Sequence, residues 1–268
     1  MIHAIDVHGH FGHYDRGGLS LRDRFFTGGI DTVIQRARAA GVTLTLVSAI
    51  RALIPYRGDV LRGNEDARRA AEDHDEVRFW VVIDPRVPAS YAQADTMLAH
   101  ARCVGIKIHP HAHEYEISQH GEAIFAFAAA RRALVLTHSG DPGSYPEDFV
   151  AFADRYPAMS LILAHLGNSA DGNPTRQVYA IQRAAAGNLY VDTSSASSMY
   201  SGLIEWAVGQ IGADRMLFGT DTPLYATSAQ RSRIDGAEID DAARRRILHG
   251  TAEALLHQHA RSATGGAT

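Results

Sequence analysis

Histidine and aspartate residues occur in this chain at positions where they could together bind a metal ion. His8 and His10 are two residues apart in the run Ile-Asp-Val-His-Gly-His, residues 5–10. In a strand this spacing places both imidazoles on one face, about 6.6 Å apart, so both can reach the same divalent ion. The spacing alone is weak evidence, because the chain has 15 histidines and repeats this spacing elsewhere.

Three further polar residues end hydrophobic runs later in the chain. His138 follows Leu-Thr, His165 follows Leu-Ala, and Asp221 follows Phe-Gly-Thr. A single histidine of this kind is more commonly a hydrogen-bonded core residue than a ligand. Four separate hydrophobic runs that all end in His or Asp are better explained together. We therefore predict a metal site in which three histidines and one aspartate surround a divalent ion.

The chain has 26 lysine and arginine residues together, and Lys107 is the only lysine among them. It lies two residues before His109 on an expected strand, and we expect both side chains to face the site. Lysine differs from arginine in that it can lose its proton. We weigh a purely structural lysine against an ammonium that binds a substrate carboxylate or carbonyl oxygen, and we favour substrate binding.

Two long segments, residues 11–29 and 50–64, follow the first two expected strands and should form the rim that recognises substrate. Candidate substrate-binding residues are His109 and Tyr225, which should reach the pocket, and Arg51, Tyr56 and Arg57, which could clamp a carboxylate. Surface exposure is the commoner explanation for an arginine. For His111 and His113 a solvated loop is as plausible as substrate contact.

Eight apolar, β-branched runs alternate with helical stretches and should position these side chains. The runs are residues 4–7, 44–48, 79–83, 105–108, 134–137, 161–164, 189–192 and 216–219. They are nearly continuously hydrophobic, as in strands that are buried on both faces. The pattern predicts an α/β fold, a single (β/α)8 TIM barrel with the metal site at the C-terminal face of its strands.

The rest of the chain fits one barrel domain. A long helix over residues 239–259 should close the ring. We expect the barrel to span residues 1–261 and residues 262–268 to form a disordered tail.

Composition excludes several classes of protein. Hydrophobic residues make up 46% and charged residues 21%, which is ordinary for a globular chain. The net charge of −4 without a basic run argues against nucleic-acid binding, and no apolar stretch is long enough to span a membrane. The single cysteine, Cys103, cannot form an internal disulfide, so we expect a cytoplasmic protein. We also expect its partner to be a small-molecule substrate. Self-association into a homo-oligomer stays open.

Taken in order, the motifs resemble those of the amidohydrolase superfamily, specifically its aminocarboxymuconate-semialdehyde-decarboxylase-like branch. The resemblance covers residues 5–223 and includes Gly-Ile-Lys-Ile-His-Pro, Thr-His-Ser-Gly and Phe-Gly-Thr-Asp-Thr-Pro. It implies that His8, His10, His138 and Asp221 bind the ion. It also implies that His165 stands beside the ion as an acid, a base or a carbonyl polariser.

The resemblance also bears on the metal. In binuclear relatives a lysine on the fourth strand is carboxylated and bridges two ions. We disfavour this role for Lys107, because the branch is mostly mononuclear. One divalent ion is expected, Zn²⁺ in preference to Mn²⁺.

Three functions follow, in order of preference. The first is a metal-dependent hydrolase of an amide, lactone or other carbonyl centre, in which the ion activates water, Asp221 takes the proton and His165 polarises the carbonyl. The second is a metal-dependent, non-oxidative decarboxylase of a small aromatic or unsaturated acid. Some decarboxylases of the branch have Glu in place of the first histidine, and His8 therefore favours hydrolysis. The third is a catalytically inactive barrel that binds metal or ligand.

Overall fold

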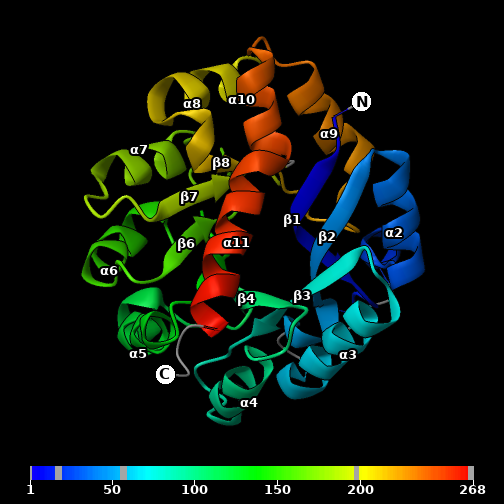
Figure 1. Ribbon diagram of the computed structural model, residues 1–268, viewed down its shortest axis with the longest axis vertical. Coiled ribbons are helices and arrows are strands. Elements are labelled where there is room, and N and C mark those ends of the chain that lie inside the picture. Colours follow the sequence, from blue (N-terminus) through cyan, green and yellow to red (C-terminus); the bar gives the residue numbers. More distant parts are fainter. Residues whose placement is uncertain (1, 16–19, 55–58, 196–198, 265–268) are drawn as a thin grey trace.

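Eight parallel strands form the centre of the protein, in the spatial order β1 to β8 (Figure 1). The computed structural model describes residues 2–15, 20–54, 59–195 and 199–264, with side chains up to residue 259. The strands are β1 (Ala4–Phe11), β2 (Val42–Ala49), β3 (Val77–Val82), β4 (Cys103–Ile108), β5 (Leu134–Thr137), β6 (Ser160–Leu163), β7 (Leu189–Asp192) and β8 (Met216–Leu217). The predicted (β/α)8 barrel is confirmed.

Backbone hydrogen bonds between the first strand and the segment after β8 close the barrel. Val7 N donates to Phe218 O at 2.9 Å, and Asp221 N donates to His8 O at 2.7 Å. The first strand runs four residues further than the apolar run 4–7, because its ladder with β2 continues through the pair His10 and Ser48. Both histidines of the initial pair therefore lie within β1.

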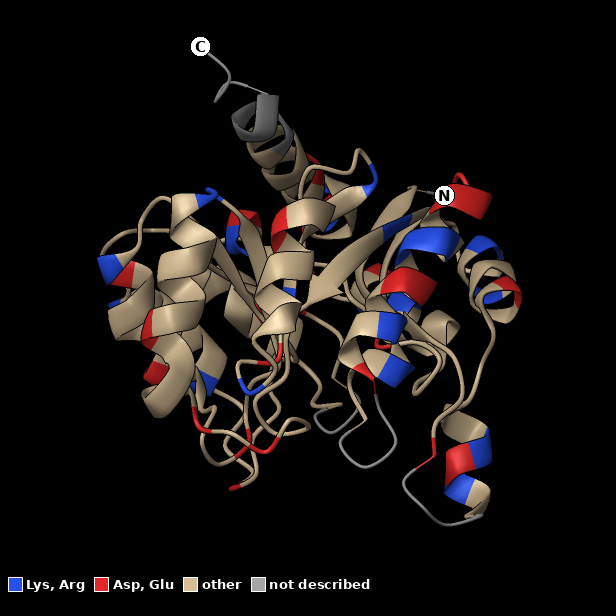
Figure 2. Ribbon diagram, turned by 90° about the horizontal axis from the view of Figure 1, so that it is seen from below, with Lys and Arg blue, Asp and Glu red and all other residues tan. Residues whose placement is uncertain are grey.

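Helices cover the outside of the barrel (Figure 1). The main ones are α2 (Ile30–Ala39), α3 (Val60–Asp73), α4 (Ala89–Met97), α5 (Ile117–Ala130), α6 (Val150–Arg155), α7 (Arg176–Arg183), α8 (Leu203–Ile211) and α9 (Thr227–Asp235). Short 3₁₀ turns occur at Ile50–Ala52, Pro146–Phe149 and Ala213–Arg215. The helix α1 (Leu21–Phe26) has no buried residue. In Figure 2 it stands away from the barrel at the end where the strands terminate.

The expected single helix over residues 239–259 is instead built from three pieces. These are α10 (Asp241–Arg245), a π-helical turn (Arg246–Gly250) and α11 (Thr251–Thr264). The helix α11 crosses the N-terminal end of the barrel (Figure 1). Its Ala252 and Leu255 are buried against Val7, Trp80 and Leu217 from the barrel interior. Apolar side chains therefore fill the N-terminal end, and polar chemistry is confined to the C-terminal end.

The end of the chain differs from the predicted tail. Residues 262–264 continue α11, since adding a turn to an existing helix is easier than starting one. The remaining tail positions, 265–268, lie outside the described residues. Of the helices in the described part of the chain, none is both long and apolar enough to cross a lipid bilayer.

Candidate metal centre

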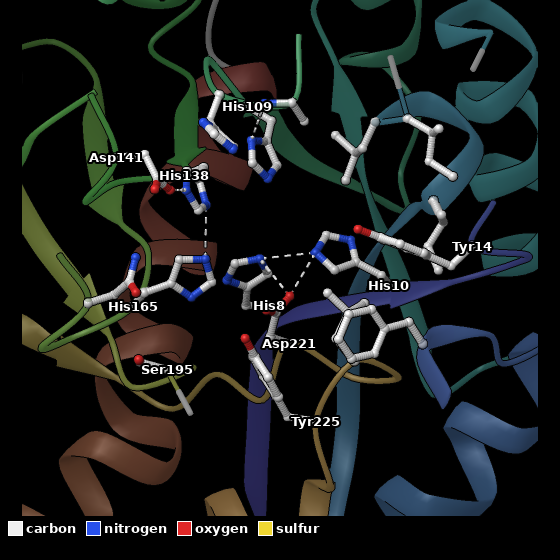
Figure 3. A pocket seen from close by; sticks show the side chains of 18 of the residues that line it. His8, His10, Tyr14, His109, His138, Asp141, His165, Ser195, Asp221 and Tyr225 are labelled. Carbon is white, nitrogen blue, oxygen red and sulfur yellow. Dashed lines mark hydrogen bonds and ion pairs between the residues drawn. The ribbon is translucent and has the colours of Figure 1, made fainter. Parts of the chain in front are cut away.

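Three donor atoms converge at the C-terminal end of the barrel (Figure 3). His10 Nε2 lies 3.1 Å from His8 Nε2 and 3.1 Å from Asp221 Oδ1. The distance between His8 Nε2 and Asp221 Oδ1 is 3.6 Å. Bond lengths of about 2.0–2.1 Å in a tetrahedral site separate neighbouring donors by about 3.4 Å. The spacing and chemistry of the three donors therefore fit one divalent ion of this size.

Local backbone structure explains how the donors meet. The period of β1 places both imidazoles on its inner face, and Gly9 between them faces β2. A Cβ on Gly9 would lie 2.7 Å from Thr45 Cγ2, so a larger residue at this position would displace the two histidines that flank it. Asp221 adopts a left-handed φ of 57°, a backbone conformation that is uncommon for residues other than glycine and that recurs at functional sites.

Each of the four candidate histidines has one ring nitrogen fixed by an oxygen atom. The pairs are His8 Nδ1 with Asp192 Oδ2 at 2.9 Å, His10 Nδ1 with Ser48 Oγ at 2.9 Å, His138 Nε2 with Asp141 Oδ2 at 2.5 Å, and His165 Nδ1 with Ser194 Oγ at 2.7 Å. Such contacts set the tautomer and the ring orientation of a metal-binding histidine. The second nitrogen of each ring faces the other polar groups of the site.

His138 and His165 lie next to the three donors, but they face each other. His138 Nδ1 is 3.1 Å from His165 Nε2, and the ring centroid of His165 is 4.9 Å from that of His8. Among the described residues, His138 does not belong to the group formed by His8, His10 and Asp221. The predicted neighbour of the ion, His165, thus lies between the predicted fourth ligand and His8.

Burial keeps these imidazoles neutral at neutral pH. Desolvation lowers the pKa of His8 and His165 well below the usual histidine range, and it also lowers the pKa of His138. A neutral imidazole is the form that binds metal. The site therefore requires little or no loss of protons from these rings at pH 7.

Asp6 supports the site from below and was not among the predicted residues. Its carboxylate accepts hydrogen bonds from His8 N at 3.1 Å, Thr220 N at 3.0 Å and Thr220 Oγ1 at 2.6 Å. Burial raises the pKa of Asp6 to about 7. Its position two residues before His8, on the same face of β1, was the available sequence signal.

Lys107 lies deeper in the barrel than we expected. It is fully buried, its Nζ is 3.0 Å from His8 Nε2, and burial lowers its pKa to about 8. It does not line the cavity above the donors, whereas His109, two residues further along β4, does. The His109 ring stacks on His138 with centroids 4.1 Å apart. The strand period predicted the direction of Lys107 correctly, but not its depth.

The donors form the inner end of a cavity of about 220 Å³ (Figure 3). Tyr225 lines this cavity, as predicted. Arg51 does not line it, because its guanidinium pairs with Asp66 Oδ2 at 3.1 Å on α3. The other two proposed loop residues, Tyr56 and Arg57, lie outside the described part of the chain.

The two segments predicted to form the rim, residues 11–29 and 50–64, contribute to the lining of the cavity, although their lining residues were not predicted individually. The lining includes the apolar residues Ile50, Leu53, Ile54 and Leu224. Toward α1 the lining includes Tyr14, Arg22 and Phe26. These residues lie in the long loop after β1 and in α1, where no periodic pattern relates sequence position to the site. The cavity therefore combines ion-binding atoms with a surface suited to a small, flat, partly apolar molecule.

Comparisons with known proteins agree with this fold. The profile of the family described as amidohydrolase matches residues 5–258. No curated protein matches the chain. Similar solved structures include a 2,6-dihydroxybenzoate decarboxylase from Rhizobium, with 15% identity, a TM-score of 0.72, and coverage of 96% of this chain and 99% of that one.

Two other similar structures contain manganese. A dihydroxybenzoic acid decarboxylase from a Polaromonas strain, with bound manganese and the inhibitor 2-nitroresorcinol, has 17% identity and a TM-score of 0.70, covering 96% of this chain and 97% of that one. A 5-carboxyvanillate decarboxylase from Novosphingobium aromaticivorans, with manganese and 4-hydroxy-3-methoxy-5-nitrobenzoic acid, has 13% identity and a TM-score of 0.72, covering 95% and 96%. At these identities the likeness establishes the fold.

Proposed function

The chain belongs to the amidohydrolase family, and we propose that it is a metal-dependent, non-oxidative decarboxylase of a small aromatic or unsaturated carboxylic acid. The observation that carries this proposal is the three-donor group at the inner end of a small cavity whose lining is partly apolar. The similar structures favour decarboxylation over hydrolysis, since their descriptions name decarboxylases of hydroxylated aromatic acids. Hydrolysis, which the sequence favoured, is supported by His8 alone.

His8, His10 and Asp221 are the proposed metal ligands, and His138 is the proposed fourth. The contact between His138 Nε2 and Asp141 supports this role, because it leaves Nδ1 as the available donor. The nitrogen and oxygen donors suit both Zn²⁺ and Mn²⁺. The ion, when bound, would hold the substrate carboxylate and stabilise negative charge that develops during the reaction.

His165 is the proposed proton donor. In the reaction the bond between the carboxyl group and its carbon breaks, CO₂ leaves, and the electron pair stays on the carbon, which then takes one proton. Burial lowers the pKa of His165 and leaves the ring neutral at pH 7, so His165 would take up this proton from solvent before it delivers it to the carbon. Ser194 Oγ holds its Nδ1, so Nε2 is the atom that delivers the proton.

The apolar lining residues are proposed to position the ring and exclude water. Leu53 and Leu224 offer no hydrogen-bonding groups in their side chains, so a flat apolar ring suits the space beside them better than water does. A volume of about 220 Å³ limits the substrate to a small molecule, consistent with a single ring.

A product assay tests this function. The protein, loaded with Mn²⁺ or Zn²⁺, is incubated in D₂O with dihydroxybenzoates, 5-carboxyvanillate and a set of lactones. We expect CO₂ release and one deuterium on the carbon that lost the carboxyl group. A His165→Gln variant should lose turnover while it retains its metal. Ring opening of lactones without CO₂ release would instead favour hydrolysis.

A further inference from the structure

Arg22 is a cation on the lining of the candidate active-site cavity that has no ion-pair partner among the residues that the structure describes. Its guanidinium lies over the ring of Phe26, 5.1 Å from the centroid. Some other arginines of this chain pair with nearby carboxylates and are not available in this way, as Arg51 with Asp66. An unpaired guanidinium on a cavity wall is suited to an anionic group of a ligand.

The contacts around α1 hold Arg22 at the cavity. Gly12 and Gly28 exchange two backbone hydrogen bonds, of 2.7 and 3.1 Å, which tie the chain on either side of α1 together. A Cβ on Gly28 would lie 2.8 Å from Pro223 Cβ, so this tie packs directly against the segment that carries Asp221. The Phe26 ring in turn meets Tyr14 edge-on, with centroids 5.2 Å apart.

Arg22 and the metal ligands lie at different depths of this cavity. His8, His10 and Asp221 are buried at the ends of β1 and β8, whereas α1 contains no buried residue and stands off the barrel (Figure 2). Positive charge would therefore be available at the metal end when an ion is bound, and at Arg22. The lining also includes the Asp141 carboxylate, which pairs with His138.

We propose that Arg22 is a specificity-determining residue that binds a second anionic group of the substrate, at the outer end of the cavity. This inference rests on the proposed decarboxylase function, in which the metal end takes the carboxylate that is lost. It narrows the substrate class to acids that carry two anionic groups. Because Arg22 is exposed, its contribution is modest compared with that of a buried ion pair.

Binding of two probes that differ by one carboxylate tests the proposal without any need for turnover. Affinities of benzoate and benzene-1,3-dicarboxylate are measured by calorimetry on the Mn²⁺-loaded protein at low salt. The variants are Arg22→Gln and, as a matched control, Arg24→Gln, which removes the same charge from an exposed position of α1 that does not line the cavity.

The dicarboxylate should bind the wild-type protein more tightly than benzoate does. Arg22→Gln should weaken dicarboxylate binding by about three- to tenfold, as for an exposed charge-assisted contact, and change benzoate binding by less than about twofold. Arg24→Gln should change neither. Equal weakening of both probes, no weakening, or the same effect from Arg24→Gln would overturn the proposal. Failure of the CO₂ assay alone would count against decarboxylation and leave this result intact.

Discussion

Asp192 Oδ2 lies 2.9 Å from His8 Nδ1, which joins the end of β7 to a donor on β1. The other carboxylate oxygen of Asp192 accepts hydrogen bonds from the backbone N–H groups of His165 and Ser194, at 3.0 and 2.9 Å. One buried carboxylate thus orients a proposed metal ligand and fixes the backbone of the proposed proton donor.

Replacing Asp192 with Asn should weaken metal binding. The amide retains the size of the side chain but not its charge, so it holds the His8 ring less firmly and lowers the basicity of Nε2. We expect metal affinity to fall about ten- to a hundredfold, as is typical for partners of ligand histidines. Competition with a chelator measures this. Asp84→Asn, at a buried carboxylate that pairs with Arg86, is the control and should leave affinity unchanged.

Metal content tests the proposed ligand set directly. His10→Ala should lose its ion, because this removes one of three donors that lie within 3.6 Å of each other. His138→Ala should also lose metal if His138 is the fourth ligand. His113→Ala is the control, since this buried ring contacts the Ala52 carbonyl. Elemental analysis of the purified variants gives the answer, and full occupancy in His138→Ala would exclude His138 as a ligand.

The sequence predicted the barrel and the residues at its mouth for one physical reason. A parallel strand buried on both faces is read as an apolar run, and a polar residue that ends such a run must lie at the C-terminal face. His138, His165 and Asp221 were found in this way. Their pairing with one another was not predictable, because it depends on how eight strands are staggered around the barrel.

Residues in loops were predicted poorly. Arg51 follows β2 closely, but the turn Ile50–Ala52 places it beside Asp66, and no periodic pattern specifies such a turn. Arg22 was missed for the same reason, since α1 makes no core contact that would leave an apolar stripe. For Lys107 the strand period predicted the correct face of β4. Because Lys107 lies two positions before His109 on this strand, it is about 6.6 Å deeper in the barrel than His109.

Lys107→Met should stabilise the metal-free protein at pH 7. Burial lowers the pKa of Lys107 from 10.5 to about 8, so folding disfavours its charged form by about 3 kcal/mol. Because the unfolded chain keeps this proton between pH 8 and 10.5 while the folded one does not, wild-type stability should recover as pH rises through this window. Urea unfolding at pH 7 and pH 10 measures the difference. If the difference in free energy of unfolding between Lys107→Met and the wild type grew with pH in favour of the variant, this explanation would be contradicted.

Gly219→Ala tests how tightly the site is packed. A Cβ at this position would lie 3.1 Å from both Asp192 Cγ and His8 Cβ, so the side chains of Asp192 and His8 must shift to make room for the added methyl group. We expect a destabilisation of about 1–3 kcal/mol together with weaker metal binding. Gly209→Ala is a matched control, because a Cβ there meets no atom within 4 Å in α8. It should be neutral or stabilising, so equal losses in both variants would indicate a general intolerance of alanine.

Protonation of buried histidines should destabilise the metal-free protein as the pH falls below 6.5. The Asp6 carboxyl, whose pKa burial raises to about 7, opposes this effect with a single proton. Burial lowers the pKa of His8, His109, His138 and His165, so below pH 6.5 the unfolded chain takes up protons that the folded chain does not. The free energy of unfolding should therefore fall as pH drops from 6.5 toward the lower folded pKa values, by up to about 1.4 kcal/mol per pH unit for each histidine. Urea unfolding at pH 7, 6 and 5 measures the slope. His109→Gln should reduce it, whereas His257→Gln, on the exposed side of α11, should not; a slope that responds equally to both would show that burial is not its cause.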